Sequence, residues 1–381
     1  MAIEKFTAYN PTRLHFGRGV VGQLGENTLK YGKKALLIYG RGSVKKYGYY
    51  DTVVDVLKAS DIEIVEYSGI RPNPVIEDVR KAKDLCQKEH VDVIVALGGG
   101  SVIDTAKIIS LSLSSGFDGW DIMKNKVRPE SATPLICVLT LAATGTEMDA
   151  AAVVQNDETG EKIGYVNELI FPKESFLDPS FTTTVPKNYT TYGIVDLMAH
   201  ALESYFGYGE PAIIDDITFA IIKDAMYWGP QLLNNLNNVD LRANIMLDAT
   251  LALNGLTQYG KKGGDWGVHA LGHELSLLYD LPHGATLSIA YIAWLKLQKE
   301  RIPKRIEKLG RNLFNVNSVD ETISELSAFF QNIESPVNLS EVGIGEDQKQ
   351  KIIDQMNRNT ASGMHHQLND DDRKKLVELM L

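Results

Sequence analysis

The sequence predicts an α/β domain with a mostly parallel sheet in its first half and an all-α domain in its second half. Three observations support this prediction. The chain has 381 residues, which is more than one hydrophobic core usually serves. Short β-branched runs alternate with helical patterns up to about residue 187, as in sheets built from crossover connections. From Asn188 onward, long helical patterns dominate. We therefore expect domains at 1–187 and 188–381.

The individual elements follow from hydrophobic periodicity. In the first half we expect strands at 34–40, 62–69, 91–100 and 134–141, with helices at 47–58, 75–88 and 101–114. Strands that alternate with helices in this way form a mostly parallel sheet that is covered on both faces. In the second half, the stretches 217–236, 242–256 and 301–314 have the spacing of amphipathic helices.

Composition excludes several classes of protein. Hydrophobic residues make up 44% and charged residues 23% of the chain, as in an ordinary globular protein. The formal net charge of −10 and the lack of a basic stripe oppose nucleic-acid binding. We find neither a signal peptide nor a run of about eighteen apolar residues, so we expect a cytoplasmic protein that does not enter the membrane. Cys86 and Cys137 have no metal-binding or redox spacing and are expected to be core thiols.

The clearest chemical signal lies between residues 196 and 283. Asp196 and His200 are four residues apart in a helical pattern, as are His269 and His273, so each pair shares one helix face. His283 follows Pro282, where we expect the helix to have ended and a loop to begin. Four of the eight histidines of the chain lie in this region.

One carboxylate and three imidazoles form a ligand set for a divalent first-row metal with a position left open for substrate. We expect Asp196, His200, His269 and His283 to be the ligands. His273 is then a nearby residue that could pass a proton, because an unperturbed imidazole titrates near neutral pH. The alternative is that these are ordinary polar residues on amphipathic helices. The ligand types suit Fe(II), Zn(II), Mn(II), Co(II) or Ni(II), and the order of affinities alone does not select among them.

A glycine-rich turn provides a second signal. Gly98, Gly99, Gly100 and Ser101 lie between an apolar strand pattern and a helical pattern. Glycines let the backbone approach an anion closely, and free amides at a helix N-terminus favour negative charge, so a pyrophosphate fits here. Asp104, one turn later, could hold the loop or a ribose. The motif is neither a GxGxxG nor a Walker sequence, and a turn needed only for packing is the alternative.

The turn at 39–48 bears on the choice of nucleotide. In dinucleotide-binding sheets, an acid near such a strand end accepts the ribose 2′-hydroxyl and disfavours a 2′-phosphate. The chain has no Asp or Glu between Glu26 and Asp51, whereas Gly40 is followed by the donors Arg41, Ser43, Lys45 and Lys46. This pattern favours NADP(H) over NAD(H), although lysines after a turn are also common on ordinary surfaces.

Several motifs occur together in a familiar order. They are GGGSVIDTAK at 98–107, TLAATGTEMD at 140–149, LDPSFTTTVP at 177–186, DLMAHALE at 196–203, and HALGHE followed by PHG. The whole chain resembles the iron-containing (group III) alcohol dehydrogenases. The segments YGRGSVKKYG, ALNGL and HALGHELS are most similar to those of the branch that contains NADPH-dependent butanol dehydrogenases and broad aldehyde reductases.

The resemblance implies a dehydroquinate synthase-like architecture, with an N-terminal dinucleotide-binding domain and a helical domain that holds one divalent metal, Fe(II) or Zn(II). It also implies hydride transfer between NADP(H), or NAD(H), and a small primary alcohol or aldehyde. The family's metal pattern matches the four residues expected from spacing, and its nucleotide pattern adds Asn73, Thr140, Thr144 and Lys162 to the glycine turn.

Two positions depart from close relatives. Arg41 stands where they often have Gly, and Asp149 where they often have Asn. A homodimer is expected because the family often pairs. A glycerol dehydrogenase or a dehydroquinate synthase-like lyase, which also combine a nicotinamide and a metal, are the alternatives within the same architecture.

Overall fold

The computed structural model describes residues 3–381, which form two compact units. We call residues 9–185 and 236–250 the sheet unit, and residues 3–8, 186–235 and 251–381 the helical unit. The predicted fold class, a parallel sheet followed by a helical part, is confirmed. A single boundary after residue 187 would assign residues 3–8, 186–187 and 236–250 to the other unit.

The sheet unit contains six parallel strands in the order β1-β8-β5-β4-β2-β3. Their bounds are β1 Arg13–Phe16, β2 Lys34–Gly40, β3 Glu63–Ile70, β4 Val93–Gly98, β5 Leu135–Leu139 and β8 Glu174–Leu177. A separate antiparallel hairpin consists of β6 Ala151–Asn156 and β7 Glu161–Val166. The four predicted strands correspond to β2, β3, β4 and β5. Strands β1 and β8 and the hairpin were not predicted from the sequence.

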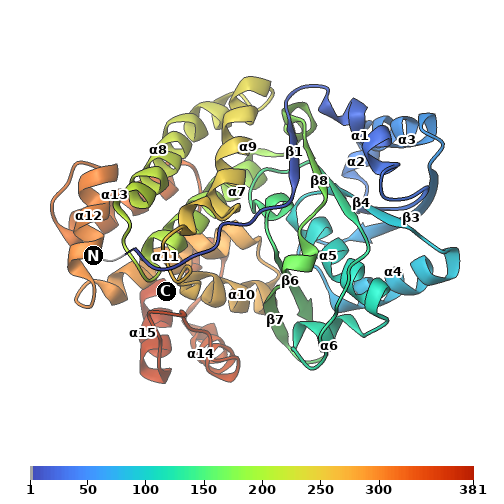
Figure 1. Ribbon diagram of the computed structural model, residues 1–381. Coiled ribbons are helices and arrows are strands. Elements are labelled where there is room, and N and C mark those ends of the chain that lie inside the picture. The colour runs from blue at the N-terminus through green and yellow to red at the C-terminus, as the bar shows by residue number, and fades with distance from the viewer. Residues whose placement is uncertain (1–2) are drawn as a thin grey trace. The chain divides into compact units, whose positions relative to one another are not determined.

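Helices cover both faces of this sheet, and Figure 1 shows α1 and α3 on one side and α4 and α5 on the other. The bounds are α1 Leu24–Thr28, α2 Ser43–Lys46, α3 Tyr49–Ala59, α4 Ile76–Glu89, α5 Gly100–Ser115 and α6 Gly119–Met123. Alternate residues of β2 and β4 enter different cores: Ile38 and Ala96 pack with α4 and α5, whereas Leu37 and Val95 pack with α1 and α3. Because both faces are buried, these strands are apolar throughout.

The helical unit has no strand among its described residues. Its helices are α7 Lys187–Phe206, α8 Ala212–Asn234, α10 Gly267–Tyr279, α11 His283–Gln298, α12 Pro303–Leu313, α13 Val319–Asn332, α14 Lys349–Arg358 and α15 Asp370–Met380. Most of α9, Val239–Leu253, belongs to the sheet unit. Helix α7 is buried on every side from Gly193 to Phe206, so it is the central helix of its unit.

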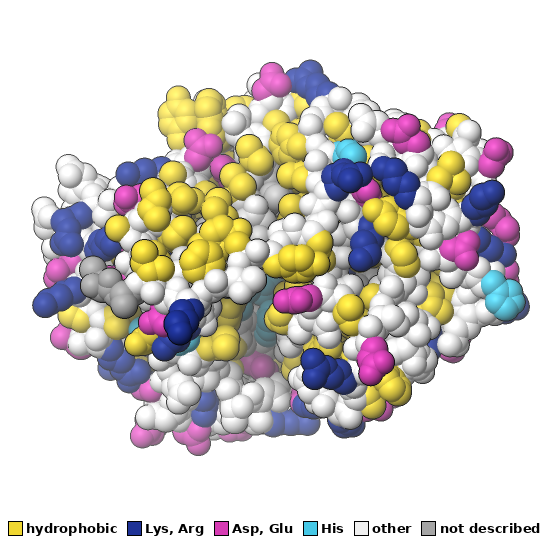
Figure 2. Space-filling view, viewed as in Figure 1, with side chains coloured by type: hydrophobic (Ala, Val, Ile, Leu, Met, Phe, Trp, Pro, Cys, Tyr) yellow, Lys and Arg dark blue, Asp and Glu magenta, His cyan; other side chains and the backbone are white. Residues whose placement is uncertain are grey.

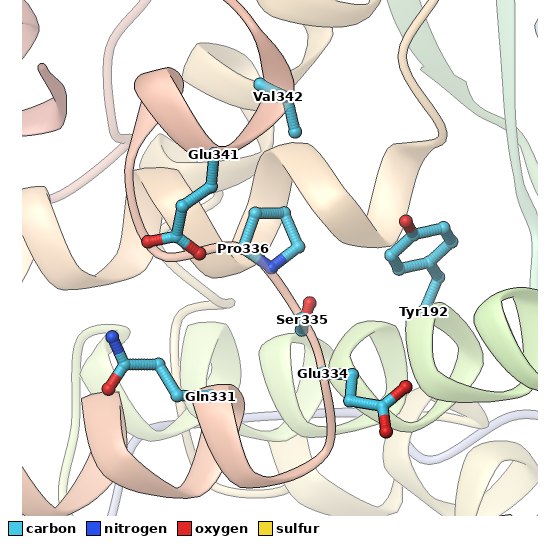
Figure 3. A pocket seen from close by; sticks show the side chains of 7 residues that line it. All are labelled: Tyr192, Gln331, Glu334, Ser335, Pro336, Glu341 and Val342. Carbon is cyan, nitrogen blue, oxygen red and sulfur yellow. The ribbon is translucent and has the colours of Figure 1, made fainter.

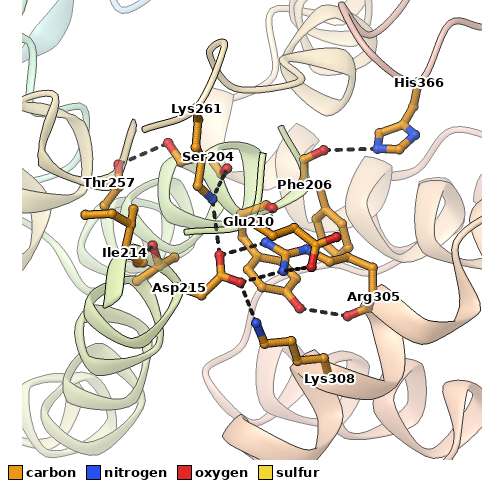
Figure 4. Close-up of polar contacts among 12 residues, drawn as sticks. Ser204, Phe206, Glu210, Ile214, Asp215, Thr257, Lys261, Arg305, Lys308 and His366 are labelled. Carbon is orange, nitrogen blue, oxygen red and sulfur yellow. Dashed lines mark hydrogen bonds and ion pairs between the residues drawn. The ribbon is translucent and has the colours of Figure 1, made fainter. Parts of the chain in front are cut away.

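A buried ionic cluster fixes the end of α7 (Figure 4). The Asp215 carboxylate is fully buried and accepts hydrogen bonds from Arg305 at 2.5 and 2.7 Å, from Lys308 at 2.7 Å and from Lys261 at 3.3 Å. The Arg305 guanidinium also stacks 3.5 Å above the Tyr205 ring. Breaking a buried pair of this kind typically costs about 3–5 kcal/mol. The cluster therefore holds α7, α8 and α12 in a fixed arrangement.

The surface carries charges of both signs. On the face shown in Figure 2, acidic and basic side chains are interspersed and form no continuous basic stripe. This distribution agrees with the net charge of −10 and offers no phosphate-binding track on that face. Across residues 3–381, none of the helices combines the length and the apolar character that crossing a bilayer requires.

Candidate metal centre and glycine loop

Four predicted ligands converge inside the helical unit. Helix α7 supplies Asp196 and His200, α10 supplies His269 and α11 supplies His283. The Oδ1 atom of Asp196 lies 3.7 Å from Nε2 of His200, 3.8 Å from Nε2 of His269 and 3.9 Å from Nε2 of His283. These separations are too long for hydrogen bonds, but they suit donors arranged around one cation.

His283 corrects one expectation, because it is the first residue of α11 and does not lie in a loop. Pro282 is the N-cap and has the extended backbone of a residue that precedes a helix. Gly284 lies against the backbone of α7, and a Cβ there would come within 2.2 Å of the carbonyl oxygen of Tyr192. Only a glycine permits this contact, which brings His283 to the helix that carries Asp196.

The donor atoms have the properties of a metal site. Asp196, His200 and His269 are buried, and one donor atom from each lies within 4.8 Å of the others. Asp196 Oδ1 and His269 Nε2 have no hydrogen-bond partner among residues 3–381. Unpartnered buried polar atoms are costly, and a divalent cation would satisfy both of them. The residues present therefore fit the metal that the resemblance implies.

The electrostatics differ between the two buried histidines. Burial lowers the pKa of His200 to about 4, so its imidazole is neutral at physiological pH, as a metal ligand must be. Burial would also lower the pKa of His269, but the carboxylates of Asp196 and Glu203 outweigh it and raise this pKa to about 9. A cation at the site would compete with that proton.

Glu203 is a buried carboxylate in contact with a predicted ligand, His269, and this contact was not predicted from the sequence. Its buried Oε1 accepts a hydrogen bond from the backbone N–H of His269 at 3.0 Å and lies 3.1 Å from Nδ1 of the same residue. A proton on Nδ1 leaves Nε2, on the side of Asp196, as the atom with a free lone pair. The sequence spacing could have indicated this contact, because Glu203 follows Asp196 by seven residues and so shares its helix face.

Trp266 forms one wall of the centre. Its ring centroid lies 6.2 Å from that of His200 and 5.4 Å from that of His269. Its φ of 62° is in the left-handed region, which a bulky residue rarely adopts, and strain of this kind concentrates at functional sites. A Cβ on Gly264 would come within 3.0 Å of the indole. The backbone thus holds an aromatic ring beside two ligands.

His273 lies next to the ligands without joining the buried trio. It is half-buried on α10, with its ring centroid 5.2 Å from that of His283 and 6.4 Å from that of His269. These distances place an ionisable group beside the centre.

The predicted nucleotide-binding residues gather at one edge of the sheet. Gly40 ends β2, Gly98 ends β4, and Thr140 follows β5. Since β4 pairs with both β2 and β5 in parallel, the carboxyl ends of all three lie side by side. Ligands of open α/β sheets bind at this edge. Arg41 is exposed just beyond β2, and Ser43 begins α2.

The glycine loop is closely packed. Gly99 is the N-cap of α5, and Gly100 and Ser101 are its first residues. A Cβ on Gly100 would come within 2.8 Å of the Thr144 hydroxyl oxygen, so the loop and Thr144 are in contact. The Ser101 hydroxyl donates to the carbonyl of Pro72. Next to it, Lys162 donates to the Asn73 side chain at 2.9 Å.

Asp104 holds the structure around this loop. One of its oxygens accepts from the Thr146 hydroxyl at 2.7 Å and the other from the backbone N–H of Val153 at 2.9 Å. Burial raises the pKa of Asp104 to about 6. Both carboxylate oxygens therefore bind residues of the protein itself, Thr146 and Val153.

Lys107 and Asp149 form a buried ion pair that the sequence analysis missed. The fully buried ammonium of Lys107 donates to Asp149 Oδ1 at 2.5 Å, to the Thr146 hydroxyl at 2.8 Å and to the carbonyl of Ala151 at 2.7 Å. The charge of Asp149 thus compensates that of Lys107. This pairing is a physical reason for an acidic residue at position 149.

A pocket of about 280 Å³ in the helical unit is lined by none of the predicted site residues (Figure 3). It is lined by Tyr192, Gln331, Glu334, Ser335, Pro336, Glu341 and Val342. Glu334 pairs with Lys187 at 2.6 Å, and Glu341 accepts from the side chain of Asn338. Because both carboxylates already have partners, this pocket is a poor candidate for the reaction site.

Comparisons with known proteins agree over the whole chain. Residues 11–179 match the model of the iron-containing alcohol dehydrogenases, and residues 190–380 match the C-terminal model of the same family. The probable NADH-dependent butanol dehydrogenase 1 of Bacillus subtilis is 38% identical over 100% of both chains. The NADPH-dependent aldehyde reductase YqhD of Escherichia coli is 33% identical over 99% of both. The crystal structure of NADH-dependent butanol dehydrogenase A from Thermotoga maritima has a TM-score of 0.96 at 36% identity and covers 100% of this chain, with 99% of its own chain matched.

Proposed function

The chain belongs to the iron-containing alcohol dehydrogenase family, and we propose that it interconverts small primary alcohols and aldehydes by hydride transfer to and from a nicotinamide nucleotide. The observation that carries this proposal is the convergence of Asp196, His200, His269 and His283, with two buried donor atoms left without hydrogen-bond partners among the described residues. A structural or scaffolding protein has no reason to keep such a costly arrangement.

The four ligands suit Fe(II) or Zn(II), and coordination chemistry alone does not select between them. When bound, such a cation supplies Lewis acidity that stabilises negative charge on a substrate oxygen. The neutral imidazole of His200 provides a lone pair, and Glu203 orients His269. Trp266 excludes water from one side of the centre. His273, beside His283, is positioned to give a proton to the product alkoxide or to take one from an alcohol.

For the nucleotide, we propose that the pyrophosphate binds at Gly98–Ser101 with Asn73, Thr140, Thr144 and Lys162 nearer the nicotinamide ribose. We favour NADP(H) over NAD(H) because of the donors in the turn after β2. The relatives do not decide this point, since one carries NADH and another NADPH in its name. The expected substrate, a small butanal-like aldehyde, rests on the family resemblance and on these names, of which the first specifies butanol and the second an aldehyde. From the family resemblance, we also propose a homodimer.

The test is an assay of purified protein after removal of metal and reconstitution with Fe(II) or Zn(II). A panel of short aldehydes is offered with NADPH or NADH, and absorbance at 340 nm is followed. We expect steady oxidation of the nucleotide that requires metal and is abolished in His200→Ala. Metal content of wild type and variant is measured in parallel. A lyase of the same architecture would return its nucleotide unchanged, so turnover without net loss of absorbance would contradict the proposal.

A further inference from the structure

An acidic residue lies beside the turn after β2, although the sequence around that turn contains none. Glu66 on β3 stands opposite Leu37 of β2 in the parallel ladder. Side chains alternate along a strand, so Glu66 and Tyr39 project from the same face. The register therefore brings a carboxylate from a distant position to the end of β2.

Glu66 already forms an ion pair with Lys45, one of the cations of the turn that favour a 2′-phosphate. Its Oε2 accepts from the Tyr39 hydroxyl at 2.6 Å and from the Lys45 ammonium at 3.3 Å. Its Oε1 accepts from the Tyr50 hydroxyl at 2.5 Å. The ammonium also lies 4.2 Å from the centroid of the Tyr50 ring, at cation–π distance.

The remaining cations of the turn are not neutralised in this way. Arg41 and Lys46 make no ion pair with any residue from 3 to 381, and both are exposed. The side chains of Lys45 and Glu66 are themselves 48% and 41% exposed, so a ligand at the end of β2 can reach them. The turn thus presents two uncompensated cations and one lysine that is already paired.

We propose that Glu66 is a specificity-determining residue for the nucleotide, because it neutralises Lys45 and weakens the turn's preference for a 2′-phosphate. This inference rests on the proposed function and on the nucleotide lying at the ends of β2 and β4. A 2′-phosphate is strongly anionic at neutral pH, so it is attracted by Lys45 and repelled by Glu66, whereas the 2′-hydroxyl of NAD(H) is neutral. Glu66 thereby lets the enzyme accept both nucleotides.

The experiment is a double-mutant cycle on the ratio of the NADH and NADPH dissociation constants, measured by fluorescence titration at low ionic strength. Glu66→Gln keeps polar atoms for the two tyrosines and removes the charge. We expect it to raise the preference for NADPH about 3- to 10-fold, an effect that shrinks with added salt because the groups are half-exposed. Lys45→Met should lower the preference for NADPH by a similar factor, because it leaves the charge of Glu66 unpaired, and the double variant should return to within about 2-fold of the wild-type ratio.

Glu63→Gln is the matched control. Glu63 is the first residue of the same strand and pairs with Lys34 at 2.8 Å, so the substitution makes the same change in charge without touching the turn. Thermal unfolding of each variant confirms that it is folded. If Glu66→Gln leaves the ratio unchanged, or changes it no more than Glu63→Gln does, the inference is wrong. Failure of the wild type to bind either nucleotide would instead overturn the proposed function.

Discussion

Replacing Glu203 by alanine should weaken metal binding by about 10- to 100-fold, the usual effect of removing a group that orients a ligand. Glu203 Oε1 holds both the backbone N–H and Nδ1 of His269, at 3.0 and 3.1 Å. Without it, the imidazole can rotate or place its proton on Nε2, which removes the lone pair from the side of Asp196. A 10- to 100-fold loss corresponds to about 1.4–2.8 kcal/mol, within the range for hydrogen bonds to charged groups.

Glu203→Gln separates orientation from charge. A glutamine oxygen can still accept from His269, so we expect an intermediate loss of affinity that is smaller than for the alanine variant. Metal affinity is measured by competition with a chromophoric chelator, and imidazole NMR reports which nitrogen of His269 carries the proton. Glu274→Gln is the control, because Glu274 is a buried carboxylate on α10 that accepts hydrogen bonds from Gln355 and Asn359.

A folded Glu203→Ala protein that binds metal as tightly as wild type would contradict this prediction. A general loss of stability would not mimic the expected result, since Glu274→Gln should lower the unfolding midpoint while leaving the metal dissociation constant unchanged.

Three further predictions concern the proton donor, the metal and a buried acid. His273→Gln should retain metal but lower kcat roughly 100-fold, as measured by metal analysis and steady-state kinetics; an unchanged kcat rejects the relay. The free energy of unfolding should be about 4 kcal/mol higher in the presence of metal at 1,000 times its Kd than after the metal is removed with a chelator. No such difference should remain in His200→Ala. Because burial raises the pKa of Asp104 to about 6, the folded state binds this proton more tightly than the unfolded state does. Its contribution to stability is therefore present at low pH and lost as pH rises through about 6. Wild type should gain about 1 kcal/mol relative to Asp104→Asn between pH 7.5 and pH 5, as measured by urea unfolding, and equal changes in both proteins would contradict this.

The residues that sequence reasoning brought together share a helix or follow a strand. Asp196 and His200 could be placed on one face because helical spacing fixes their directions, and the glycine turn could be placed because β4 is a long apolar run. Strands β1 and β8 contain only four residues each, too few for a periodic pattern to stand out. Glu66 escaped notice for a different reason, since its position at the turn depends on the register between β2 and β3.

Close contacts at glycines explain how distant segments meet at the site. Gly284 allows α11 to begin against the backbone of α7, which brings His283 to Asp196, and Gly264 leaves room for the ring of Trp266. Gly100 does the same for Thr144 in the sheet unit. In each case a Cβ would lie at 3.0 Å or less from its neighbour, a distance that real Cβ atoms hardly show. A sequence does not distinguish such a glycine from one that only makes a turn, because the neighbour that requires it is remote along the chain. The ligand types could thus be predicted from local spacing, whereas the contacts that assemble them depend on tertiary packing.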